Sequence, residues 1–173
     1  MKKYTIKLYY LLFSIFLLIV VIIITLNISF LTIELKEHTN QKIVLQKIVK
    51  PGDIFSLKYT HSVAQTPVWE IFKITDKGGL ILIETYFSDH GAGLPYTNFE
   101  NEIFIKEDNK FKIKNMSREI ELPLYYRVGE IRENYFIFQQ EEINLSKMLG
   151  NSVATIDIVQ INLFNYLLKY LVG

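Results

Sequence analysis

The chain has 173 residues, with 19 basic residues, 18 acidic residues and no cysteine. Half of its residues are apolar and 14% are aromatic, which excludes a disordered chain because so much apolar surface drives burial. The balanced charge does not favour a nucleic-acid-binding surface. The lack of cysteine excludes disulfides, cysteine-ligated metals and a thiol nucleophile.

The first 33 residues have the composition of a membrane anchor. Lys2, Lys3 and Lys7 precede a run from position 8 to 33 that carries no charge. At a rise of about 1.5 Å per residue this run is about 39 Å long, which exceeds a hydrocarbon core of about 30 Å. The run is longer than the apolar region of a signal peptide, and no Ala-x-Ala cleavage site follows it. We therefore predict an uncleaved signal anchor over 1–33, with a cleaved signal peptide as the alternative.

The lysines before this run set the orientation of the chain. The positive-inside rule keeps them in the cytoplasm, so the remainder of the chain lies outside. This predicts a single-pass protein of the cell membrane with an extracytoplasmic C-terminal domain. Residues 34–42 are polar and are predicted to link the anchor to a β domain over 43–173.

From position 43 onward apolar residues recur with a period of two, which is typical of half-buried strands. Turn signals such as Gly78-Gly79 separate these runs at intervals of about 8–12 residues. The predicted strands are 54–61, 68–75, 80–88, 103–107, 110–114, 120–122, 125–128, 135–139 and 153–158. The pattern predicts an all-β fold, either an antiparallel β-sandwich or a partly open barrel.

Two segments are predicted to be helical. Residues 144–149 form a single turn, and residues 162–172 form a short amphipathic helix with Asn162, Asn165 and Lys169 on a narrow polar stripe. The wide apolar arc of the second helix has two interpretations. It packs on the open end of the sheet, or it contacts the bilayer surface or a membrane partner.

The first candidate binding site follows the strand 54–61 and comprises His61, Ser62, Thr66 and Glu70. Histidine titrates near neutral pH and can be an acid, a base or a ligand, although a histidine at a strand end is also a common structural residue. Ser62 beside His61 suggests a nucleophile, but strand neighbours point to opposite faces and no Gly-x-Ser-x-Gly elbow occurs.

The second candidate binding site comprises Gly91, Ala92, Gly93 and Pro95. Two glycines separated by one residue allow a sharp turn whose exposed amides can bind an anion, and a plain turn stiffened by Pro95 is the alternative. Asp89, His90 and His61 could supply metal ligands, but their spacing does not require a metal. We expect neither a metal nor a cofactor.

Arg118 is the third candidate, because a guanidinium suits planar recognition of a carboxylate. The alternative is a solvated sheet face. The three consecutive strands that begin at position 54 are expected to pair antiparallel, which brings segments 61–70 and 88–95 to the same edge of the sheet. We predict that these two segments form one binding junction.

The chain resembles the domain-of-unknown-function family 1850. The resemblance rests on Tyr59-Thr60-His61-Ser62-Val63, on Thr66-Pro67-Val68 with Glu70, and on Gly91-Ala92-Gly93-Leu94-Pro95. Met116 and Arg118 fit less specifically, and the resemblance covers about residues 43–160. It implies a small, often membrane-anchored protein encoded beside TRAP transporters of the TAXI type, which import organic acids or amino-acid-like solutes. It implies no activity.

These observations predict a non-enzymatic accessory protein of such a transporter, held at the outer membrane face by its anchor. The expected partners are the membrane, a membrane or solute-binding subunit of the transporter, and a small organic anion, but no nucleic acid. One alternative is a membrane-anchored hydrolase that uses His61, Ser62 and Glu70. Another is a structural envelope protein without a ligand.

Overall fold

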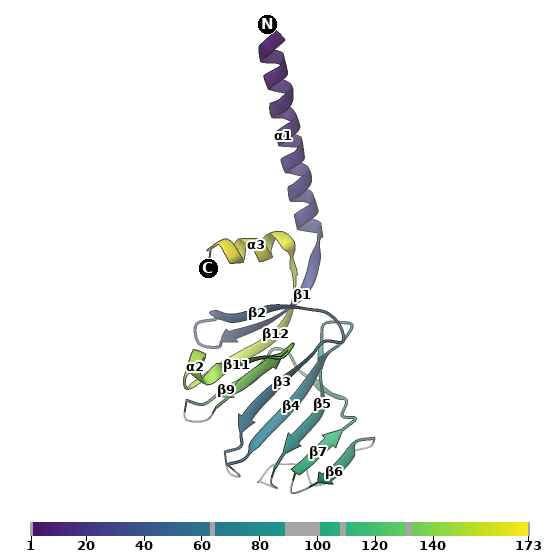
Figure 1. The fold of residues 1–173 in the computed structure, drawn as a ribbon, viewed down its shortest axis with the longest axis vertical. Coiled ribbons are helices and arrows are strands. Elements are labelled where there is room, and N and C mark those ends of the chain that lie inside the picture. The colour runs from purple at the N-terminus through teal and green to yellow at the C-terminus, as the bar shows by residue number, and fades with distance from the viewer. Residues whose placement is uncertain (1, 63–64, 89–100, 108–109, 131–132, 173) are drawn as a thin grey trace. The chain divides into compact units, whose positions relative to one another are not determined.

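The computed structural model describes residues 2–62, 65–88, 101–107, 110–130 and 133–172. The chain divides into two compact units (Figure 1). The first unit combines Met1–Leu31 with Gln160–Gly173, and the second is Thr32–Val159. Each terminus of the chain therefore belongs to the first unit.

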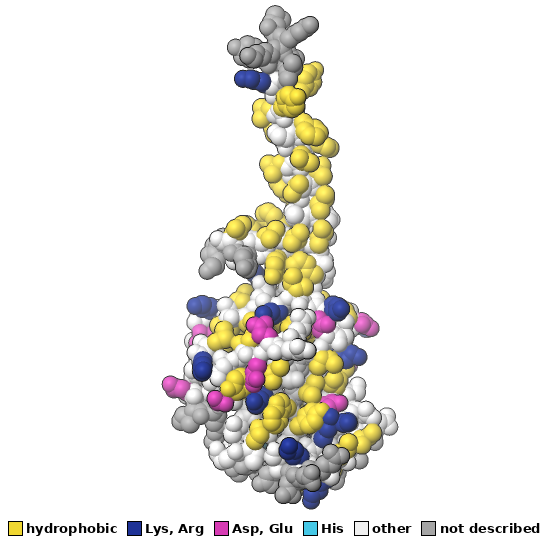
Figure 2. Space-filling model, viewed as in Figure 1, with side chains coloured by type: hydrophobic (Ala, Val, Ile, Leu, Met, Phe, Trp, Pro, Cys, Tyr) yellow, Lys and Arg dark blue, Asp and Glu magenta, His cyan; other side chains and the backbone are white. Residues whose placement is uncertain are grey.

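The first unit consists mainly of two helices, α1 (Lys2–Asn27) and α3 (Leu163–Val172). The stretch Lys7–Asn27 is long and apolar enough to cross a membrane, a test that a signal sequence also passes. Its hydrophobic side chains cover the helix surface (Figure 2). The helix α3 starts beside the end of α1, because the amide of Leu163 donates to the carbonyl of Ile28 at 2.8 Å.

The second unit contains two antiparallel sheets. The smaller sheet has the order β2-β1-β12-β9, with bounds β2 Ile43–Val49, β1 Ser29–Glu37, β12 Ser152–Asn162 and β9 Leu124–Val128. The larger sheet has the order β11-β10-β3-β4-β5-β7-β6, and β8 also pairs with β5.

The strands of the larger sheet have the following bounds: β11 Glu141–Asn144, β10 Tyr135–Phe138, β3 Ile54–Thr60, β4 Pro67–Ile74, β5 Leu80–Phe87, β7 Lys110–Lys114, β6 Ile103–Glu107 and β8 Arg118–Ile120. The helix α2 (Leu145–Leu149) follows β11. The side chain of Asn144 caps it by accepting from the amide of Lys147 at 2.9 Å.

The core lies on the inner face of the larger sheet, where aromatic side chains stack across strands. Phe55 stacks on Phe72 and on Phe136, with both ring centroids 5.2 Å away. Tyr59 on β3 meets Tyr126 on β9 of the smaller sheet, edge to face at 6.1 Å. Burying each phenylalanine side chain contributes about 1.5–3 kcal/mol, so this cluster is a main source of stability.

The hairpin between β4 and β5 has the predicted turn chemistry. Gly78 has φ of 75° and donates its amide to the carbonyl of Thr75 at 3.0 Å. This left-handed conformation costs glycine little, because it has no Cβ. The turn fixes a register in which Val68 pairs with Phe87, so the start of β4 and the end of β5 lie at the same edge of the sheet.

The predicted all-β antiparallel fold is confirmed, and the sheets do not close into a barrel. The helices predicted at 144–149 and 162–172 correspond to α2 and α3. The first four residues of the predicted linker 34–42 instead belong to β1, which continues to Glu37 within the smaller sheet. Glu34 is only 1% exposed. Its carboxylate accepts a hydrogen bond from the side-chain amide of Gln46 at 2.7 Å and forms an ion pair with Lys36 at 2.8 Å.

Candidate functional site

A row of aromatic and lysine side chains crosses the outer face of the larger sheet. Tyr135 of β10 pairs with Lys58 of β3, Lys58 with Trp69 of β4, Trp69 with Tyr86 of β5, and Tyr86 with Lys112 of β7. The strands β3, β4, β5 and β7 lie side by side in Figure 1. Paired residues on adjacent strands project to the same face. Their chain neighbours, such as Leu57, Val68 and Phe87, are buried, so this row faces outward.

Cation–π contacts link side chains within two parts of the row. The Nζ of Lys58 lies 4.9 Å from the ring centroid of Tyr135 and 5.6 Å from that of Trp69. The Nζ of Lys112 lies 4.1 Å from the ring centroid of Tyr86. Ammonium groups at these distances are attracted to the ring faces. These contacts restrain the rings of Tyr135, Trp69 and Tyr86.

An open groove of about 860 Å³ lies along this face. Its lining comprises Pro67, Trp69, Ile71, Tyr86, Phe87, Ser88, Ile105, Lys110, Phe111, Lys112 and Lys114. Lys110, Lys112 and Lys114 occupy alternate positions of β7, so they share one face of the strand. The groove thus combines an aromatic and aliphatic floor with a cationic wall.

The central lysine of this wall is engaged by a carboxylate. The Nζ of Lys112 lies 2.9 Å from Glu84 and also donates to the hydroxyl of Tyr86, which in turn donates to Glu84 at 2.6 Å. Desolvation opposes the charged form of Lys112, but its hydrogen bonds to Tyr86 and Glu84 outweigh this and raise its pKa. Lys110 and Lys114 form no ion pair with any described residue, although the charge of Lys114 helps to lower the pKa of the Glu84 carboxyl group.

Glu70, one of the predicted site residues, points to the other side of the sheet. It pairs with Leu57 and Thr85, which are 0% and 7% exposed. The hydroxyl of Tyr59 donates to its carboxylate at 3.5 Å. Burial raises the pKa of Glu70, and the hydrogen bond from Tyr59 only partly offsets this. Burial and the charge of Glu70 likewise raise the pKa of the Tyr59 hydroxyl. Glu70 is therefore a half-buried acid on the inner face of the sheet and does not line the groove.

His61, Ser62 and Thr66 belong to the turn between β3 and β4. The amide of His61 donates to the carbonyl of Thr66 at 2.8 Å, and the side-chain amide of Gln65 donates to the carbonyl of Ser62 at 2.7 Å. The hydroxyl of Thr66 is buried and has no hydrogen-bond partner among the described residues. Pro67, which follows this turn, lies at one end of the groove.

The predicted junction between segments 61–70 and 88–95 stays a prediction. Thr60 pairs with Pro67 and Val68 pairs with Phe87, so the strand ends that flank both segments lie at one edge. Ser88 and Pro67 both line the groove. Gly91, Ala92, Gly93 and Pro95 lie outside the described residues, as do Asp89 and His90.

Arg118 lies away from that edge. It forms a bidentate pair with Glu102, with both nitrogen–oxygen distances 2.8 Å, and the hydrogen bonds of this pair raise its pKa. Arg118 pairs with Leu82, which lies about 17 Å along β5 from Phe87 at about 3.4 Å per residue. The structure thus does not bring Arg118 to the turn that holds His61.

In the part of the chain that the structure describes, no group of three or more His, Asp or Glu side chains is arranged to hold a metal ion. Sequence reasoning missed the groove, although one signal was available. The segment Lys110–Lys114 reads KFKIK, and this alternation places three lysines on one face and Phe111 and Ile113 on the other.

Taken together, the fold and the groove define a small antiparallel β domain with a cationic, aromatic face, joined to an apolar N-terminal helix. The family model described as Domain of unknown function (DUF1850) matches residues 55–145. Because this match covers more than half of the chain, the protein belongs to that family. No curated protein and no solved structure matches the chain.

Proposed function

We propose that this protein is a non-catalytic binding domain, anchored at the outer face of the cell membrane, that accompanies a solute transporter and binds an organic anion. The observation that carries this proposal is the groove with its aromatic floor and the lysines of β7. A carboxylate is attracted to Lys110 and Lys114, while Trp69 and Tyr86 cover the apolar body of the ligand.

The chemistry of the groove supports organic acids over other ligands. Glu84 pairs with Lys112, which leaves Lys110 and Lys114, at opposite ends of β7, without an ion-pair partner among the described residues. Two separated cations beside an indole ring suit a carboxylate that carries an apolar or aromatic group. The resemblance to proteins encoded beside TAXI-type TRAP transporters agrees with this, because such transporters import organic acids. A transporter subunit is the proposed protein partner on the same ground.

The hydrolase alternative is less well supported by the geometry. It needs His61, Ser62 and Glu70 around one substrate. Glu70 faces the interior, where Tyr59 binds its carboxylate, whereas the groove lies on the opposite face of β4. An acid held there does not orient a histidine toward a substrate in the groove.

The proposal is tested by titrating the full-length protein in mild detergent with small monocarboxylates and dicarboxylates. Trp69 is the only tryptophan and lines the groove, so its fluorescence reports binding directly. Replacing both Lys110 and Lys114 by alanine should weaken binding about tenfold per lysine, equivalent to about 1.4 kcal/mol each.

The matched control is Lys77→Ala, because Lys77 is an exposed lysine in the β4–β5 turn and does not line the groove. This variant should bind as tightly as the wild type. Equal affinities for the wild type and the double variant would refute the groove as the anion site. Purification of the wild type from membranes in the same detergent tests the transporter, whose subunits should co-purify.

A further inference from the structure

The helix α3 carries a continuous apolar surface on one side. Its exposed hydrophobic side chains are Phe164, Leu167, Leu168 and Leu171, and Leu171 is 81% exposed. At about 100° per residue, these four positions fall within one arc of about 100° around the helix. The exposed polar residues Asn165 and Lys169 lie outside this arc. Such a helix is typical of a membrane interface.

The position of α3 is fixed by contacts with the residues that follow α1. The amide of Leu163 donates to the carbonyl of Ile28 at 2.8 Å, and the side chain of Gln160 donates to the hydroxyl of Ser29 at 2.9 Å. The ring of Tyr166 contacts Phe30 edge to face at 5.2 Å. The helix therefore starts at the level where the apolar helix α1 ends.

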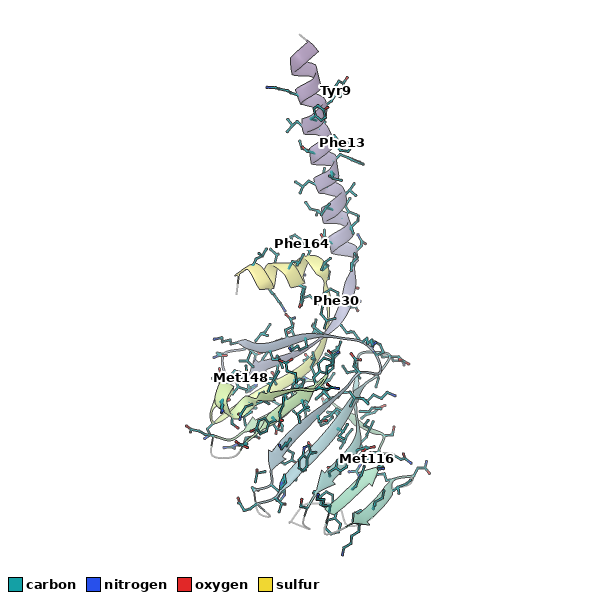
Figure 3. All side chains as sticks on the ribbon, viewed as in Figure 1. Tyr9, Phe13, Phe30, Met116, Met148 and Phe164 are labelled. Carbon is teal, nitrogen blue, oxygen red and sulfur yellow. The ribbon has the colours of Figure 1, made fainter. Side chains whose placement is uncertain are left out.

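The apolar arc of α3 faces back toward α1. Tyr166 lies about 100–160° around the helix from the four residues of the arc, and its ring contacts Phe30, which follows α1 in the chain. In Figure 3, α3 runs crosswise to α1, with Phe164 on the side of α1 and Phe30 on the other side. A bilayer crossed by α1 would meet this arc.

We propose that α3 lies in the outer interface of the bilayer that α1 crosses, with its apolar arc among the lipid acyl chains. This inference rests on the proposed anchoring through α1. The first charged residue after Lys7 is Glu34, so the apolar zone of α1 reaches the level of α3. For this reason a bilayer fits the apolar arc better than a second protein does.

The absence of cysteine allows a direct test with single-cysteine variants of the full-length protein. Leu168→Cys and Leu171→Cys place a label on the apolar arc, and Asn165→Cys is the matched control on the polar side of the same helix. Phe16→Cys places a label in the middle of α1. Each variant is labelled with an environment-sensitive fluorophore and reconstituted into phosphatidylcholine–phosphatidylglycerol vesicles that contain spin-labelled lipids.

The labels on the apolar arc should emit at shorter wavelength and be quenched several-fold more strongly than the label at position 165. Quenching should be strongest with a shallow lipid spin label, because an interfacial helix enters about 5–10 Å into the bilayer. Arc labels that are exposed to water, or shielded from water without lipid quenching, would overturn the placement of α3. Loss of quenching at position 16 would instead overturn the anchor, so the two failures are distinguishable.

Discussion

The substitution Phe55→Ala tests the packing that positions the larger sheet. Phe55 is 1% exposed, and it stacks on Phe72 from β4 and on Phe136 from β10. Removal of a buried phenylalanine ring costs about 3–5 kcal/mol. Because whole domains are stable by only about 5–15 kcal/mol, the variant should lose about a fifth or more of its stability.

Phe55→Leu separates the stacking from the burial. Leucine retains most of the buried apolar volume but loses both ring pairs, each of which contributes about 0.5–1.5 kcal/mol. The free energy of unfolding of Phe55→Leu should therefore fall by about 1–3 kcal/mol, which is less than the fall expected for Phe55→Ala. The assay is urea unfolding of the full-length protein in mild detergent, followed by the fluorescence of Trp69.

The matched control is Ile54→Ala, because Ile54 precedes Phe55 on β3 and is 48% exposed. An exposed substitution of this kind changes stability by only about 0.5 kcal/mol. If Phe55→Ala unfolded at the same urea concentration as Ile54→Ala, the stacked cluster and the pairing of β10 with β3 would be wrong.

Three further predictions concern the residues that the sequence singled out. Burial raises the pKa of Glu70 above 4.5, so the unfolded chain binds fewer protons between that value and the folded pKa, and stability falls as pH rises through this interval. Glu70→Gln should therefore unfold at a higher urea concentration than the wild type at neutral pH, and at the same urea concentration below pH 4.5. A lower urea midpoint of the variant at neutral pH would contradict this prediction. Arg118→Ala removes the bidentate partner of Glu102, which is 8% exposed, and should lower the free energy of unfolding by about 1–3 kcal/mol. An unchanged urea midpoint would show that the pair contributes nothing to stability. His61→Ala should weaken ligand or partner binding and leave the unfolding curve unchanged, and unfolding of the variant would assign His61 a structural role only.

The period-two pattern and the turn residues were sufficient to predict most of the strands. They failed at β1, where the four residues from Thr32 to Leu35 are all buried and no alternation exists. Glu34 makes this segment look like a polar linker. Its burial is tolerated only because Gln46 and Lys36 bind its carboxylate, and those contacts depend on the tertiary fold.

The candidate site was less predictable, because it depends on register between strands. Glu70 and Trp69 are neighbours in the chain, yet one faces the core and the other lines the groove. The alternation within one strand predicts that they point to opposite faces, but not which face is buried. Lys58 and Lys112 join the row only through the pairing of β3, β4, β5 and β7, which no local pattern specifies.

The proposed function requires the β domain to lie outside the cytoplasm, because a groove for an imported solute must face outside. The decisive measurement is protease treatment of intact cells or protoplasts, combined with mass analysis of the N-terminus of the membrane-bound protein. We predict that residues beyond about position 40 are digested from outside, and that Met1 or Lys2 remains attached to a protected fragment that contains α1. Protection of the β domain would contradict the orientation, and a mature protein that begins near position 30 would contradict the anchor.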